Sequence, residues 1–199
     1  MKKLILFSLI LSSIGCARYL PPQDKCGFAM NSEHQRVSWN NRLPVRFYIG
    51  SDVPEIYHAA IRRAADEYNF KMGRNLIYIP LNTLNKGQVL KDGFSSVHFL
   101  YEWPDSQNVQ AKTKIFFSGA TIVEADIVVN AQDFRFNEDP FKAYFNTLDL
   151  MSLMVHEFGH VLGLAHMDTG DSVMHTYLSN GEIRRTLTDE DLLNLRCEY

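Results

Sequence analysis

The stretch from His156 to His166 constrains this chain more than any other part of its sequence. It reads His-Glu-Phe-Gly-His-Val-Leu-Gly-Leu-Ala-His. On a helix, His156 and His160 differ by about 40° and stand one turn apart on one face, so both imidazoles can bind the same metal ion. We therefore expect a helix from about Thr147 to Leu162 that presents these histidines. Its packing stripe consists of apolar residues at helical spacing, namely Leu148, Met151, Val155, Phe158 and Leu162.

The residues that follow this helix complete the predicted metal site. Gly163 has no Cβ and can adopt positive φ, so it can end the helix and turn the chain back. His166 then arrives three residues later as a third ligand. Three histidines leave the fourth position of a tetrahedral zinc ion open, which is typical of a catalytic site. We therefore predict a zinc site formed by His156, His160 and His166.

Glu157 is the predicted general base. It lies about 100° round the helix from His156, near the metal but not directed at it. There it can take a proton from water that the metal activates and pass it to the leaving amine of a cleaved peptide bond. These residues predict a zinc-dependent endopeptidase. Two alternatives stay open, a zinc-binding interaction module without peptidase activity and an amidase that acts on a cell-wall peptide.

The run from His156 to His166 resembles the metzincin zinc proteases, which also place a methionine turn beneath the metal. Ser172-Val173-Met174 is similar to that turn, so Met174 is the expected residue under the histidines. Its alternative interpretation is an ordinary core methionine. Tyr177 stands three residues after Met174, where the resemblance assigns no ligand, and we expect it to line the substrate pocket or to pack.

The wider pattern looks most like matrixins and extends over about residues 37–196. It includes Trp39, a strand with Glu124-Ala125-Asp126-Ile127 and a closing segment Leu187–Asp191. The resemblance implies an α/β (α+β) fold with one mixed, twisted sheet. It also implies a long helix after the first strand, a helix that carries the histidines and a C-terminal helix. In such folds the substrate lies as an extended strand along a sheet edge, here Lys114 to Gly119.

Local patterns predict the remaining elements. A helix after the first strand can be capped by Ser51 or Asp52 and ended by Gly73. Thr188 begins a capping box for the closing helix. The buried face of the first helix is expected to contain Ile56, Ala60, Ala64 and Tyr68. Strands are expected at Val45–Ile49, Asn75–Pro80, Val97–Tyr101, Lys114–Phe117 and Ile122–Val129.

The first residues are typical of a secretory signal. Lys2 and Lys3 precede an apolar run from Leu4 to Leu11, which is too short to span a bilayer. Gly15-Cys16 resembles the end of a bacterial lipoprotein signal, in which the cysteine is lipidated. The alternative is plain secretion with cleavage after Ala17. We favour the lipoprotein, and in either case we expect an exported protein, held at the cell envelope by its lipid or secreted.

These signals divide the chain into a signal peptide over 1–16, a tether or linker over 17–36 and a catalytic domain over 37–199. Either processing route removes Cys16 from the fold. Cys26 and Cys197 then form an even pair in an oxidising compartment, for which we predict a disulfide. The alternative is a latency switch, because Lys25-Cys26-Gly27 resembles the cysteine switch of matrix metalloproteases.

The composition limits the partners. Hydrophobic residues make up 46% and charged residues 22% of the 199, a balance typical of a globular domain. The formal net charge of −3 gives no concentrated basic surface and argues against nucleic acid. We expect a monomer that binds a protein or peptide substrate and meets a membrane only through the N-terminal lipid. The acidic stretch Asp133–Asp139 could bind calcium, although no calcium-loop pattern supports it.

Overall fold

The computed structural model describes residues 26–85, 91–139 and 146–199. The expected signal peptide, Cys16 and the first part of the expected linker lie outside these residues. Within them, no helix combines the length and the apolar character that crossing a membrane requires.

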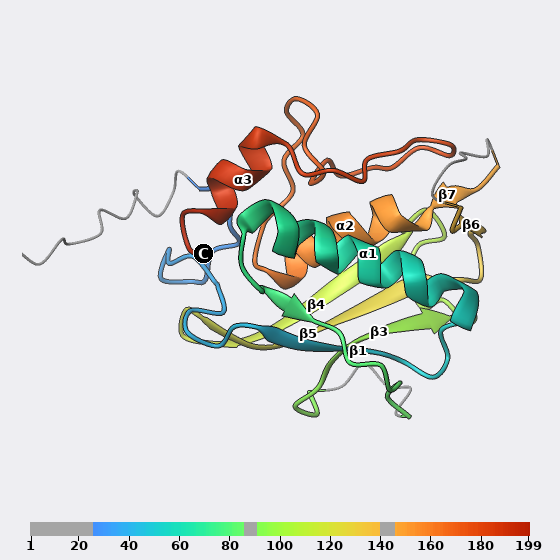
Figure 1. The fold of residues 1–199 in the computed structure, drawn as a ribbon, viewed down its shortest axis with the longest axis horizontal. Helices are drawn as coiled ribbons and strands as arrows, with labels where there is room; N and C mark the ends of the chain where they lie inside the picture. The colour runs from blue at the N-terminus through green and yellow to red at the C-terminus, as the bar shows by residue number, and fades with distance from the viewer. Residues whose placement is uncertain (1–25, 86–90, 140–145) are drawn as a thin grey trace, which may run out of the picture.

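A five-stranded mixed sheet forms the floor of the molecule (Figure 1). Its order is β2-β1-β3-β5-β4, with parallel pairs except for the antiparallel β4–β5 pair. Strand β4 therefore forms one edge of the sheet. The strands are β1 (Val45–Ile49), β2 (Ile77–Tyr78), β3 (Ser95–Leu100), β4 (Ala111–Ser118) and β5 (Thr121–Asn130), and a separate two-residue pair joins β6 (Phe136–Asn137) to β7 (Leu148–Asp149). The predicted mixed α/β fold is confirmed.

Two helices, α1 (Glu55–Met72) and α2 (Leu150–Val161), lie on the same side of this sheet (Figure 1). The ring of Phe158 in α2 meets that of Phe47 in β1 edge-on, with centroids 5.1 Å apart. Tyr68 of α1 is fully buried and donates its hydroxyl hydrogen to the Val155 carbonyl at 2.7 Å. The helix with the histidines is thus fixed by the sheet below and by α1 beside it.

The start of α1 differs from the prediction. Pro54 occupies the N-cap position and no side chain caps the helix. Asp52 instead approaches the ring of His98 at 3.0 Å. Ile56 is 60% exposed, because the buried face is turned toward Ile61 and Ala65. The end of the helix is as predicted, since Gly73 has a φ of 63°.

Several residues within the expected linker contact the domain, although residues 32–35 are exposed. Phe28 pairs with Leu164 in an antiparallel bridge. Arg36 is buried and forms an ion pair with Glu198 at 2.5 Å. A polar stretch of this kind looks like a linker in sequence, because its partners lie at the other end of the chain. The packed unit therefore includes Cys26, ahead of the boundary placed at residue 37.

The described ends of the chain are joined by a disulfide between Cys26 and Cys197. The predicted pairing is thus present, and it excludes Cys26 as a free thiolate in this structure. Cys197 follows the short helix α3 (Asp189–Leu195), whose N-terminus carries the predicted capping box. The hydroxyl of Thr188 accepts from the Asp191 N–H, and the Asp191 carboxylate accepts from the Thr188 N–H.

This capping box generates a stability prediction. Thr188→Ala removes the hydroxyl acceptor and is expected to lower the free energy of unfolding by about 1 kcal/mol. Thr188→Ser keeps the acceptor and serves as the matched control. Urea unfolding followed by circular dichroism measures both. If the alanine and serine variants unfold at the same urea concentration, the capping contact does not stabilise α3.

Candidate metal centre

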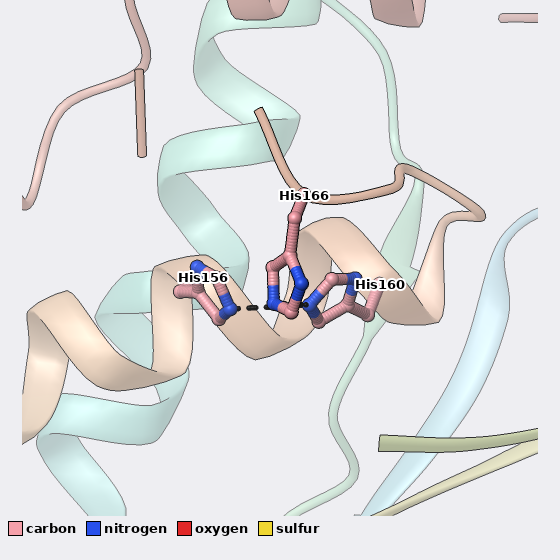
Figure 2. A group of neighbouring side chains, drawn as sticks. All are labelled: His156, His160 and His166. Carbon is pink, nitrogen blue, oxygen red and sulfur yellow. Dashed lines mark hydrogen bonds between the residues drawn. The ribbon is translucent and has the colours of Figure 1, made fainter. Parts of the chain in front are cut away.

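Three histidine rings converge at the end of helix α2 (Figure 2). The Nε2 atom of His160 lies 3.1 Å from the Nε2 atom of His156 and 3.1 Å from that of His166. Among the described residues, these three form the only group of histidine, cysteine or acidic side chains close enough together to bind a metal ion. The structure thus brings together all three histidines that the sequence singled out.

The converging nitrogens fit a metal ion better than they fit each other. The Nδ1 atom of His156 lies 2.9 Å from the Val173 carbonyl, and that of His160 lies 2.8 Å from the Leu164 carbonyl. A carbonyl only accepts, so each Nδ1 carries the hydrogen and leaves its Nε2 with a lone pair. Lone pairs that meet at this distance repel unless a cation lies between them. Tetrahedral zinc with Zn–N bonds of about 2.0–2.1 Å separates its ligand nitrogens by roughly 3.3 Å.

Loss of contact with water favours the neutral form of the three rings, of which His166 is the most exposed. Burial lowers the pKa of His156 to about 3, with the neighbouring His160 adding to the effect. Burial also lowers the pKa values of His160 and His166. Neutral imidazole is the form that binds a metal, so no proton has to leave these side chains at neutral pH.

Glu157 is buried on the sheet side of the histidines. The hydroxyl of Thr113 in β4 donates to its Oε2 atom at 2.5 Å. Burial raises the pKa of Glu157 to about 7, and the bond from Thr113 opposes that rise. A carboxyl group that gains and loses its proton near neutral pH suits a general base. Thr113 was missed in the sequence, although its inward position between the exposed Lys112 and Lys114 is a detectable signal.

Met174, the expected residue under the histidines, packs against α2 at Gly159. It is fully buried, and a Cβ added to Gly159 would come within 2.2 Å of its sulfur. Gly159 therefore has to be glycine for the helix and the methionine to pack at this distance. Gly163 has a φ of 98° and faces the Val37 carbonyl, which an added Cβ would approach to 2.2 Å. Both the conformation and the space at Gly163 require glycine.

Asp191 is a further supporting residue that the sequence reveals only as a helix cap. Its buried carboxylate accepts from the Ser172 hydroxyl at 2.6 Å and from the Val173 N–H at 3.2 Å. Since the Val173 carbonyl orients His156, the cap of α3 also positions the metal centre. The capping box can be predicted from the sequence, whereas this second contact joins residues that are distant along the chain.

A cavity of about 610 Å³ opens over the three histidines. Its walls are the first part of β4, including Ala111, Thr113 and Ile115, and the segment around Tyr177. The expected edge strand is confirmed as an edge, but the part beside the histidines lies nearer residue 111 than Gly119. Tyr177 lines the cavity and is 57% exposed, which agrees with one of its two predicted roles.

A second polar cluster has the contacts of a serine hydrolase triad. It is buried, so a substrate cannot reach it. Ser96 Oγ lies 2.9 Å from His98 Nε2, and Asp52 lies 3.0 Å from His98 Nδ1. Ser96 also donates to Asp126, whose pKa burial raises to about 7. Ser96 and His98 are 2% and 0% exposed, so no substrate reaches them. This cluster therefore serves packing within the sheet.

Comparisons with known proteins agree with the site. The family described as Matrixin matches residues 108–199, which include β4, α2, the three histidines and α3. Metalloendoproteinase 2-MMP of Arabidopsis thaliana is 34% identical over 61 residues, or 31% of this chain and 16% of the relative. Metalloendoproteinase 5-MMP of the same plant is 36% identical over 52 residues, or 26% of this chain and 14% of the relative.

The two relatives match over less than a third of this chain and a small share of their own length, whereas the family match covers a little under half of this chain. The region that the Matrixin family matches carries the converging histidines, the edge strand and the buried methionine. The mixed sheet and the packing of α1 against α2 are consistent with a matrixin-like fold. Residues 108–199 are therefore matrixin-like in sequence, and the chain spans a small share of the length of the curated relatives it matches.

Proposed function

We propose that this chain is a zinc-dependent endopeptidase. The observation that carries the proposal is the convergence of three neutral imidazole nitrogens beneath an open cavity, with the buried carboxyl group of Glu157 beside them. His156, His160 and His166 would hold the metal. A bound zinc ion supplies a Lewis acid that acidifies water and polarises a carbonyl group.

The remaining chemistry belongs to Glu157. Its carboxylate would take a proton from the attacking water and then deliver it to the leaving amine of the cleaved bond. Thr113 would hold that carboxylate in place through the bond to Oε2. Glu157 is only 3% exposed, which keeps bulk water from competing for the proton. A protein that only bound zinc would have no use for a buried carboxyl group at this place, which favours the enzyme over an interaction module.

The substrate would be a protein or peptide bound as an extended strand. Strand β4 pairs with β5 on one side and forms the edge of the sheet on the other. Residues of its first half line the cavity over the histidines. An added strand could therefore use backbone hydrogen bonds to β4 while its side chains enter the cavity. Export is part of the proposal, because a disulfide such as Cys26–Cys197 persists in oxidising compartments.

The first prediction concerns the metal. The chain is expected to bind a single zinc ion, and His160→Ala should weaken binding by more than about 100-fold, since even an outer partner of a ligand contributes 10- to 100-fold. Competition with a coloured chelator measures the affinity. His34→Asn is the matched control, because His34 is exposed and asparagine tolerates its positive φ. Equal affinities of the His160 and His34 variants would contradict the proposed site.

The second prediction concerns the base. Glu157→Gln keeps the shape of the side chain but cannot take a proton, so kcat/KM on a mixed peptide library should fall by at least about 100-fold while zinc is retained. Mass spectrometry of the products locates the cleaved bonds. Glu102→Gln, at an exposed position, is the control.

Two results would redirect the proposal. Full activity of the Glu157 variant would mean that another group is the base. A parent chain that binds zinc but cuts no peptide would favour an interaction module or an amidase, and a cell-wall peptide tested in the same assay separates those two.

The third prediction concerns the edge strand. A cleaved peptide that carries an N-methyl group on a backbone nitrogen two residues from the scissile bond loses a donor to β4. Its KM should rise about 10-fold or more, while kcat changes less. The same peptide methylated beyond the last residue that contacts the cavity is the control. An unchanged KM for methylation at every position would rule out strand addition.

A further inference from the structure

The third histidine is held differently from the other two. His156 and His160 are each oriented through Nδ1 by a backbone carbonyl. His166 is exposed, and within the described parts of the chain its ring bonds only to His160. The place of His166 is therefore set by its backbone.

That backbone is fixed on both sides of His166. The N–H of Met167 donates to the Met174 carbonyl at 2.9 Å. The N–H of Ala165 donates to the Gly27 carbonyl at 2.8 Å. One anchor thus comes from the segment around the buried methionine, and the other comes from Cys26–Ala29, at the opposite end of the described chain.

The Cys26–Ala29 segment also supports the turn that precedes His166. Its Ala29 N–H donates to the Gly163 carbonyl at 2.8 Å, and its Phe28 ring would lie 3.1 Å from a Cβ on Gly163. Phe28 pairs with Leu164, whose carbonyl orients His160. The Cys26–Ala29 segment therefore supports the backbone that places His160 and His166.

The Cys26–Ala29 segment is in turn fixed to the end of the chain. The disulfide joins Cys26 to Cys197. The side chain of Asn194 in α3 accepts from the Gly27 N–H at 3.1 Å and lies 3.4 Å from the sulfur of Met167. Asn194 thus contacts Met167, which follows His166, and Gly27, whose carbonyl accepts from the residue that precedes it.

We propose that the disulfide-linked Cys26–Ala29 segment, together with Asn194, is a positioning element for His166 in the metal centre. The proposal rests on the proposed zinc site and adds residues outside the matrixin match, since Cys26–Ala29 precede residue 108. A segment with only a stabilising role would lower the free energy of unfolding and leave the zinc affinity of the folded chain unchanged. Zinc affinity therefore separates the two roles.

The main experiment removes the disulfide in the full chain. Cys26→Ala/Cys197→Ala is expected to weaken zinc binding by about 10- to 100-fold, the usual effect of losing an outer partner. Affinity is measured by chelator competition at a temperature where circular dichroism shows the variant folded. The same pair of substitutions in a His166→Ala background should cause a much smaller loss, because His166 is already absent and only the support of His160 through Leu164 remains.

Two outcomes would overturn the proposal. One is an unchanged zinc affinity after removal of the disulfide. The other is an equal fold-loss with and without His166, which would mean that the disulfide acts elsewhere. A parent chain that binds zinc but cleaves no peptide would refute the proposed function alone, since these comparisons use only metal affinity. A parent chain that binds no zinc would refute both.

A second pair of variants tests the same element with the disulfide intact. Asn194→Leu removes the acceptor for Gly27, whereas Asn194→Asp keeps it. The leucine variant is expected to lose zinc affinity several-fold, and the aspartate variant is expected to bind close to the parent. If both bind like the parent, Asn194 has no part in positioning His166. This pair also decides the matter if the cysteine variants fail to fold.

Discussion

The turn at Gly163 is the constraint on which the rest of the site depends. Its φ of 98° and its contact with the Val37 carbonyl are open only to glycine. After the turn, the Leu164 carbonyl contacts the ring of His160, and His166 lies beside the other two rings. A helix alone can place two histidines on one face, but a third ligand at a tetrahedral angle has to come from a chain that has left the helix.

The end of α2 can make this turn because its carbonyl groups find partners outside the helix. Trp39 donates its indole hydrogen to the Val161 carbonyl at 2.7 Å, and Tyr199 donates to the Leu162 carbonyl at 2.5 Å. Buried carbonyls without partners would cost free energy, so these bonds allow the helix to stop inside the core. Met174 and the close approach at Gly159 fill the space below. The result is a face of the molecule on which the three histidine rings converge.

Local patterns in the sequence predict the parts of this fold that depend on neighbours in the chain. The strand Val45–Ile49, the end of α1 at Gly73 and the capping box at Thr188 follow from such patterns. The spacing of the three histidines predicts their meeting because a helix and one turn suffice. The sequence does not reveal the contacts of Thr113 with Glu157 or of Asp191 with Val173, because each joins residues far apart along the chain. Residues 26–36 look like a linker for the same reason.

The three histidines themselves depend on both local and distant contacts. His156 and His160 are brought together by one helical turn, so they are neighbours as soon as α2 forms. His166 depends on the Gly27 carbonyl and on the Met174 carbonyl, which come from opposite ends of the described chain. The disulfide that fixes Gly27 closes a separation of 171 residues. The place of His166 therefore depends on contacts from both ends of the described chain, which only the completed fold brings together.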